Sequence, residues 1–339
     1  MTRYVGRLAP SPTGALHLGN VRTFMIAWLR ARSQGGKVIF RMEDLDHPKD
    51  KPGAAAQAVE DLRWLGFDWD EEFVQSERKA VYRQALEALC SQTIEQSEQP
   101  NNRTIPPVYP CVCSRRDVEA AQSAPHEGEQ LYYPGTCRDR FATWREAVDC
   151  KLGLLASQSN NRTIEQSNNF QLPCWRFRVS ENTIVAFDDA FAGYYEQDVS
   201  RTLGDFPLAR DEFGAGYTLA CTVDDLLMGV TEVVRGDDLL AATPAQILLA
   251  RALSKAIDGC RLPSYCHVPL VVGRDGKRLA KRHGDTRIAS YRTQGKTPEE
   301  ILGFLAASCG WAESGERVTL CDLLPRFDLG TIPHAPFMI

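Results

Sequence analysis

The chain has 339 residues, of which 43% are hydrophobic and 24% charged, with a formal net charge of −5. This balance is ordinary for a folded globular protein and excludes a globally basic nucleic-acid binder, so a polyanionic partner would need a local basic patch. The first residues lack the apolar core of a signal peptide, and no run approaches a membrane span. Together with eleven scattered cysteines, this predicts a cytoplasmic protein with reduced thiols, some of them on metal, and no membrane contact.

The first third of the chain predicts a βαβ unit. Residues 4–8 read as a short strand that two prolines end, and apolar residues at helical spacing begin at Val21. A second strand is predicted over residues 37–42 and a second helix over 53–65. Strand, helix and strand in this order predict a parallel sheet with a right-handed crossover.

The remaining two thirds are less regular. Residues 110–200 are rich in cysteine, proline and aromatic residues and show no βαβ rhythm, so we expect an insertion there. Strand patterns return at residues 217–223 and 232–235, and a helix is predicted through Pro244 to Ala256. The last segment, 286–339, is predicted to be mostly helical.

Two polar tracts, residues 91–105 and 157–169, share the strings NNRTI and TIEQS. Both are nearly free of large apolar residues, so they cannot bury enough surface to offset the entropy of ordering. We expect exposed, disordered insertions without a chemical role.

The stretch RLAPSPTGALHLGNVRTF, residues 7–24, joins the first strand to the first helix. Its prolines stiffen the approach, and Gly14 and Gly19 allow a ligand to pass close by. Residues 17–20 lie at the predicted helix N-terminus, where backbone N–H groups and the helix dipole attract phosphate. Taken alone, the stretch fits an ordinary junction and a phosphate-binding loop equally well.

A glycine-punctuated loop near the C-terminus, residues 273–284, carries five cations: Arg274, Lys277, Arg278, Lys281 and Arg282. Cations on such a loop can neutralise a leaving pyrophosphate as its charge develops. The alternative is a solvated basic turn.

Together these two motifs resemble the paired signatures of class I aminoacyl-tRNA synthetases. The quartet HLGN, residues 17–20, stands where the family has His-Ile-Gly-His, and RLAKR, residues 278–282, stands where it has Lys-Met-Ser-Lys-Ser. Asn20, Arg278 and Ala280 depart from these patterns, whereas Lys281 is retained. The resemblance implies that Lys281, His17 and Asn20 are catalytic, and that ATP, with Mg²⁺, binds at His17, Gly19, Asn20 and Lys281.

Four further segments resemble the glutamyl branch of this family: residues 7–14, 40–46, 62–69 and 223–236. A dicarboxylate with one ammonium group calls for cationic or hydroxyl donors and one acid, which Arg7, Tyr217, Arg235 and Glu43 can supply. The alternative for Glu43 and Arg235 is a structural ion pair. The resemblance implies a site for L-glutamate formed by Arg7, Leu8, Ala9, Pro10, Ser11, Glu43, Tyr217 and Arg235.

Three cysteines in the insertion, Cys111, Cys113 and Cys137, match a closed tetrahedral zinc site with one further donor. On chemistry alone His126 would be the fourth ligand, and buried free thiols are the alternative to any metal. A branch of the family with a Cys-x-Cys and Tyr-x-x-x-Cys pattern implies Tyr133 instead. We expect one structural Zn²⁺ per chain.

Only 57 residues follow Arg282, too few for the anticodon-binding domains of a full glutamyl enzyme. The chain therefore resembles the truncated branch that activates glutamate with ATP and esterifies queuosine in the anticodon of tRNA(Asp). We expect a monomer. The alternatives are a minimal enzyme charging tRNA(Glu), a small-molecule nucleotidyltransferase and an inactive RNA-binding paralogue.

The resemblance also implies the architecture, an α/β fold with a Rossmann-type parallel sheet, a zinc-binding insertion and a short helical C-terminal domain. The expected boundaries are 1–109 for the first half of the catalytic domain, 110–200 for the insertion, 201–285 for the second half and 286–339 for the helical subdomain.

Overall fold

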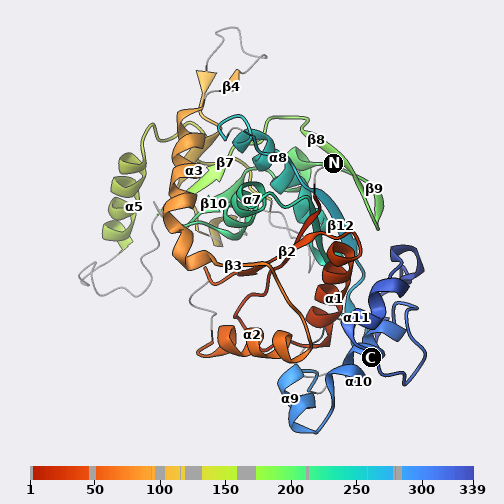
Figure 1. Ribbon diagram of the computed structural model, residues 1–339. Coiled ribbons are helices and arrows are strands. Elements are labelled where there is room, and N and C mark those ends of the chain that lie inside the picture. Colours follow the sequence, from red (N-terminus) through yellow and green to blue (C-terminus); the bar gives the residue numbers. More distant parts are fainter. Residues whose placement is uncertain are drawn as a thin grey trace.

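The computed structural model describes residues 3–45, 51–92, 94–95, 104–114, 116–118, 132–158, 173–210, 214–257, 259–277, 279 and 285–339. Two sets of strands lie at its centre (Figure 1). The first is a parallel sheet ordered β1-β2-β3, and the second is ordered β11-β12-β8-β9, in which only β9 is antiparallel. The strands span β1 Val5–Leu8, β2 Lys37–Met42, β3 Glu71–Val74, β8 Ile184–Asp189, β9 Gly193–Asp198, β11 Glu232–Gly236 and β12 Ser264–Val268.

The two sheets meet where β1 lies beside β11. The backbone N–H of Thr231 donates to the carbonyl of Val5 (2.9 Å), and the hydroxyl of Thr231 accepts from the N–H of Val5 (2.9 Å). The carboxyl ends of both strands therefore reach the same edge, where an open parallel sheet offers a ligand crevice. The predicted α/β fold with a parallel sheet is confirmed.

Five helices pack around these strands: α1 Leu18–Arg32, α2 Ala54–Trp64, α3 Lys79–Ser91, α7 Tyr217–Leu227 and α8 Thr243–Leu253. Of these, α1 connects β1 to β2 as the predicted crossover, and it buries Val21, Met25 and Leu29 in the first hydrophobic core. Helices α3, α7 and α8 pack together in the second core.

The strand predicted over residues 217–223 is wrong, because these residues begin α7. Every residue from Leu219 to Leu226 is buried, since α7 packs against α3, α8 and a strand, β10 (Phe206–Ala209). A short buried run of this kind cannot be told from a buried strand by periodicity alone.

The predicted insertion contributes to two different sheets. Strands β6 (Val108–Cys111) and β7 (Cys174–Phe177) form an antiparallel sheet with β10, and α5 (Trp144–Gln158) packs beside β6. The strand pair β8 and β9, which also lies within residues 110–200, joins the central sheet through β12. In the polar tracts, β4 (Ile94–Glu95) pairs with β5 (Thr104–Ile105), whereas residues 96–103 and 159–169 lie outside the described residues.

The C-terminal segment contains α9 (Ile288–Thr293), α10 (Pro298–Ala307) and α11 (Leu320–Leu323). Helix α10 places its apolar face in the same core as α1. The last strand, β14 (Phe337–Met338), pairs in parallel with β13 (Val271–Val272), a pairing that the sequence did not predict. Further helical turns with described bounds are α6 (Val199–Thr202) and the 3-10 segments Gln75–Arg78, Asp237–Ala242, Leu324–Arg326 and Leu329–Thr331.

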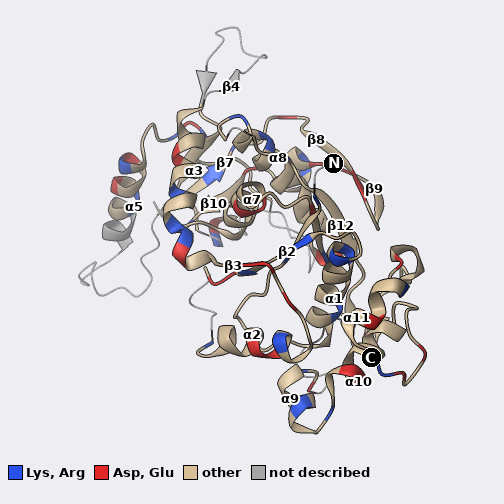
Figure 2. Ribbon diagram, viewed as in Figure 1, with Lys and Arg blue, Asp and Glu red and all other residues tan. Residues whose placement is uncertain are grey.

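Acidic and basic side chains are interspersed along the outer helices α3 and α5 (Figure 2). On α5, for example, Arg145 pairs with Asp149 one turn later (3.4 Å). Within the described part of the chain, none of the helices combines the length and the apolar character that crossing a bilayer requires.

A buried carboxylate ties α7 to the segment around α3. Asp224 accepts hydrogen bonds from Gln75 (3.0 Å), Arg78 (2.8 Å) and the hydroxyl of Tyr82 (2.8 Å), and its side chain is fully buried. Replacing it with alanine would leave these three donors without their acceptor. We predict that Asp224→Ala lowers the free energy of unfolding by about 3 kcal/mol, as expected for a broken buried charge pair.

Urea denaturation measures this loss, and Asp149→Ala is the matched control because its carboxylate is exposed on α5. An exposed ion pair adds little stability, so the control should unfold like the unmodified protein. Equal midpoints for the two variants would contradict the role of Asp224.

Candidate active site

The N-terminus of α1 is closed by His17 and Asn20. Nδ1 of His17 accepts the backbone N–H groups of Gly19 (3.1 Å) and Asn20 (3.4 Å), and Oδ1 of Asn20 accepts the N–H of His17 (3.2 Å). This reciprocal capping box satisfies donors that a helix start would otherwise leave unpaired. Three of the predicted ATP-binding residues thus meet at the positive end of the helix dipole.

Both sides of the basic loop adjoin this helix start. A Cβ at Gly19 would lie only 2.9 Å from the His17 ring, which would have to shift, and 3.6 Å from Cβ of Val271, so β13 passes within van der Waals distance of this position. On the far side of the loop, the N–H of Leu18 donates to the carbonyl of Thr286 (3.1 Å). The described residues on both sides of the second predicted signature are therefore neighbours of the first signature in the fold.

A cavity of about 460 Å³ opens at this junction. His17, Gly19 and Asn20 line it, together with Pro10 and Ser11 from the loop after β1. From the basic loop, Leu279 reaches the same cavity. Lys281, and with it Arg278 and Arg282, lies outside the described residues.

A second cavity of about 370 Å³ adjoins the first. Four of the predicted glutamate-binding residues line it: Arg7, Ala9, Glu43 and Tyr217. Arg235, a fifth, lines both cavities, and the two share the wall formed by Ala9, Thr23, Phe24, Arg235, Asp238 and Leu239. Leu8 is the exception, since its side chain is fully buried in the first core.

Glu43 directly follows β2, and two buried side chains fix its carboxylate by hydrogen bonds. Arg41, which is completely buried, donates to Oε1 of Glu43 (2.9 Å), and the thiol of Cys221 donates to the same oxygen (3.1 Å). Glu43 thus forms a structural ion pair, but its partner is Arg41 and not Arg235. Glu43 therefore forms a structural ion pair and also lines the cavity.

Arg7 is anchored in the wall of the second cavity. One terminal nitrogen donates to the carbonyl of Val234 in β11 (2.9 Å), and Nε lies 3.6 Å from Oδ1 of Asp225. The same Asp225 oxygen accepts from Arg41 (2.7 Å). The positive and negative charges therefore alternate along one row, in the order Arg7, Asp225, Arg41 and Glu43. The two ends of the row line the cavity, and its two middle members lie beneath the wall.

Arg235 contacts uncharged partners instead. Its Nε donates to Nε2 of His267 (3.0 Å), and a terminal nitrogen donates to Oγ1 of Thr243 (2.7 Å). In the described part of the chain no carboxylate pairs with it. The guanidinium is buried in the wall that the two cavities share, and it forms no ion pair with a described acid.

The structure brings the three predicted cysteine ligands together. The Sγ atoms of Cys111, Cys113 and Cys137 all lie within 4.8 Å of one another, with 3.6 Å between Cys113 and Cys137. The Tyr133 hydroxyl lies 3.3 Å from Sγ of Cys111 and 3.7 Å from that of Cys113. This cluster could hold a metal ion, whereas His126 lies outside the described residues.

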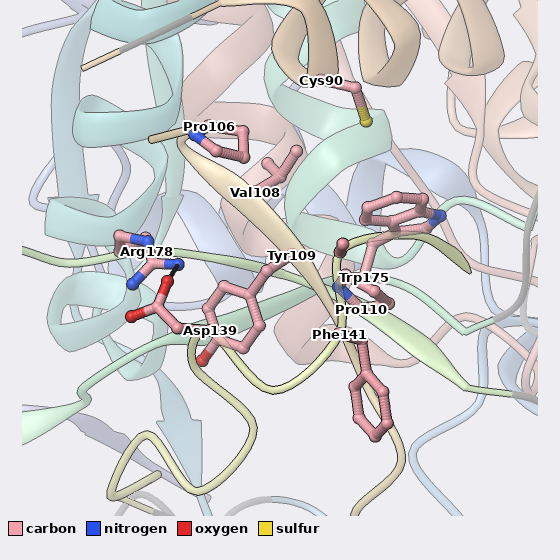
Figure 3. A pocket seen from close by; sticks show the side chains of 10 residues that line it. Cys90, Pro106, Val108, Tyr109, Pro110, Asp139, Phe141, Trp175 and Arg178 are labelled. Carbon is pink, nitrogen blue, oxygen red and sulfur yellow. Dashed lines mark hydrogen bonds and ion pairs between the residues drawn. The ribbon is translucent and has the colours of Figure 1, made fainter. Parts of the chain in front are cut away.

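A separate pocket lies beside β6 and β7 (Figure 3). Tyr109, Phe141 and Trp175 line it, and Asp139 pairs with Arg178 at its side (3.0 Å). None of its lining residues is among those predicted to bind glutamate, ATP or metal, so this pocket is distinct from the candidate active site.

Comparison with known proteins shows the family to which the chain belongs. The family model described as "tRNA synthetases class I (E and Q), catalytic domain" matches residues 4–99 and 142–322. The chain therefore belongs to the class I tRNA synthetases and is a ligase of the aminoacyl-tRNA synthetase type.

Within this class the chain belongs with the proteins named glutamyl-Q tRNA(Asp) synthetase. It is 42% identical to that of Symbiobacterium thermophilum, over 98% of this chain and 95% of the relative, and 44% identical to that of Rhodopirellula baltica, over 100% and 97%. The solved glutamate-tRNA synthetase of Elizabethkingia anophelis is 25% identical with a TM-score of 0.74, and the match covers 100% of this chain and 68% of that one.

The sequence did not predict the buried residues whose hydrogen bonds fix the side chains of the site. These are Arg41, Cys221, Asp225, Thr243 and His267. The segment 40–46 contains Arg41, and 223–236 contains Asp225, but neither residue was singled out. An arginine inside an otherwise apolar strand is a usable signal, because burial demands a compensating acid.

Proposed function

We propose that the protein activates L-glutamate with ATP and transfers it to the queuosine base in the anticodon of tRNA(Asp). The observation that carries this proposal is the shared wall of the two cavities, because the cavity proposed for glutamate then adjoins the start of α1, which is proposed to bind the phosphates. The names of the full-length relatives support the choice of tRNA(Asp).

In the first step the α-carboxylate oxygen of glutamate attacks the α-phosphorus of ATP. A P–O bond forms to glutamate, the bond to the β,γ-phosphates breaks, and glutamyl-adenylate and pyrophosphate result. In the second step a hydroxyl of the queuosine cyclopentenediol attacks the activated carbonyl, loses its proton, and releases AMP. Positioning and charge stabilisation dominate such a reaction, so no side-chain nucleophile is needed.

For ATP, we propose that His17, Gly19 and Asn20 contact the phosphates at the start of α1, and that Lys281 stabilises the charge that develops on the leaving pyrophosphate. The described residues on both sides of Lys281's loop support this role, because they adjoin Gly19 and Leu18. Mg²⁺, bound with ATP, supplies further charge neutralisation.

For glutamate, we propose that Glu43 binds the ammonium group and that Arg7 and Arg235 bind the two carboxylates. Every hydrogen bond that a described residue makes to Glu43 goes to Oε1, so Oε2 is the oxygen proposed for the ligand. Tyr217, which is 44% exposed at the cavity, adds a hydroxyl. The backbone of Leu8, Ala9, Pro10 and Ser11 completes the site.

We predict that Lys281→Ala lowers glutamate-dependent ATP–pyrophosphate exchange by a factor of about 100 or more while glutamate binding is retained, because the lysine acts on the transition state. Exchange rates and isothermal titration with glutamate measure the two effects. Lys277→Ala is the control, since Lys277 is an exposed cation in the same loop. Equal rates for both variants would refute the role of Lys281.

The choice of tRNA is tested with ATP and radiolabelled glutamate on three acceptors. We predict label on tRNA(Asp) that carries queuosine and none on tRNA(Asp) that lacks it, because the acceptor hydroxyl belongs to the modified base. A minimal glutamyl enzyme, the second candidate, would label tRNA(Glu), as the likeness to a solved glutamate-tRNA synthetase would allow. Label on tRNA(Glu) alone would contradict the proposal.

We further propose that the cluster in the insertion binds one structural Zn²⁺ through Cys111, Cys113, Cys137 and Tyr133. A tetrahedral site with Zn–S bonds of about 2.3 Å places its sulfurs about 3.8 Å apart, close to the 3.6 Å between Cys113 and Cys137. The guanidinium of Arg176 lies 3.8 Å from the Tyr133 ring centre and would offset the excess negative charge of four anionic ligands.

We predict that Tyr133→Phe reduces bound zinc below one per chain, since the variant keeps the ring but removes the oxygen donor. Elemental analysis of the purified protein measures the stoichiometry, and Tyr194→Phe, at an exposed tyrosine outside the cluster, is the control. Full zinc in Tyr133→Phe, combined with zinc loss in His126→Ala, would assign the fourth ligand to His126.

A further inference from the structure

Arg235 is fixed by partners on two neighbouring elements. Strands β11 and β12 are parallel and pair Arg235 with His267 in register, so the two side chains leave the sheet next to each other. Arg235 donates through Nε to His267 and through a terminal nitrogen to Thr243 of α8. Arg235 is 5% exposed, His267 1% and Thr243 0%. Two corners of the guanidinium are thereby held inside the protein.

A third strand fixes the orientation of His267. Oδ2 of Asp189, the last residue of β8, lies 2.6 Å from Nδ1 of His267, while Oδ1 accepts the backbone N–H groups of His267, Phe191 and Ala192 (2.8–3.0 Å). Since Nε2 of His267 accepts from Arg235, the ring proton must reside on Nδ1, where it is donated to Asp189.

This assignment agrees with the electrostatics. Burial lowers the pKa of His267 against the opposing effect of Asp189, so the ring is neutral near pH 7. Burial alone would raise the pKa of Asp189, but the hydrogen bonds from His267 and the backbone bring it down to about 2. Asp189, His267 and Arg235 therefore form a chain of a carboxylate, a neutral imidazole and a guanidinium. The guanidinium has no paired acid among the described residues.

We propose that His267, oriented by Asp189, is a positioning residue that holds Arg235 in place for a substrate carboxylate and so sets the affinity for glutamate. This inference rests on the proposed function, in which Arg235 binds that carboxylate. An arginine held in advance loses less side-chain entropy on binding, and its planar fork meets a carboxylate at a defined angle. A neutral acceptor, unlike an acid, leaves the charge of the arginine for the substrate.

Two substitutions at His267 separate the positioning role from a structural one. His267→Gln places an amide oxygen near the position of Nε2 and keeps an acceptor for Arg235. His267→Asn places an amide N–H near the position of Nδ1, so it keeps the contact with Asp189 but removes the acceptor. Both variants are assayed by ATP–pyrophosphate exchange with glutamate varied at saturating ATP, and both are checked by thermal melting.

We expect His267→Asn to raise the KM for glutamate about tenfold or more, the effect of losing one hydrogen bond to a charged group. The KM for ATP and the kcat at saturating glutamate should change little. His267→Gln should remain close to the unmodified enzyme. A wild-type-like KM in His267→Asn, or a fall in kcat with KM unchanged, would overturn the inference.

A third variant covers the case in which neither His267 variant folds. Thr243→Val removes the other acceptor of Arg235 with little change in shape, so it should also raise the KM for glutamate and leave that for ATP unchanged. An unchanged glutamate KM in this variant would overturn the inference. Absence of glutamate-dependent exchange in the unmodified protein would instead refute the proposed function itself.

Discussion

The completely buried guanidinium of Arg41 is the constraint on which the site depends. A buried charge needs compensating partners, and for Arg41 the fold supplies acids. It supplies Glu43 (2.9 Å) from the end of β2, and Asp225 (2.7 Å) and Asp224 (3.9 Å) from α7. Compensation of one charge therefore fixes α7 against the central sheet and sets the position of Glu43 at the same time.

The arginines at the cavity, unlike Arg41, are held mainly by uncharged hydrogen-bond acceptors. Arg7 donates to the carbonyl of Val234, and Arg235 donates to His267 and Thr243, so their hydrogen bonds are largely satisfied by uncharged groups. Only the 3.6 Å approach of Asp225 offsets the charge of Arg7. Guanidiniums that are held mainly by uncharged groups remain able to bind carboxylates, and Glu43 in the same cavity can bind an ammonium group, which is the pairing that glutamate requires.

The sequence predicted the parts of the fold in which local pattern and tertiary environment agree. The strand over 37–42 matches β2 in both bounds, and the helix that follows the first strand is α1. Prediction failed where the local pattern is ambiguous or silent. Helix α7 buries every residue from Leu219 to Leu226, a run that also fits a strand, and β8 joins β12 by a pairing between residues more than 70 positions apart. The residues of the site also fall into predicted and unpredicted groups. Motif residues such as Glu43 could be found by resemblance, whereas His267 acts through strand register, which no local pattern encodes.

The start of α1 shows why an asparagine is acceptable at residue 20, where the family has a second histidine. Its Oδ1 accepts the N–H of His17, and in return Nδ1 of His17 accepts the first N–H groups of the helix. Because Nδ1 is an acceptor, the neutral ring carries its proton on Nε2, which makes that atom the donor for the proposed phosphate contact. Gly19 keeps the ring in this position, since a Cβ there would collide with it. The amide of Asn20 thus closes the cap that fixes the tautomer of His17.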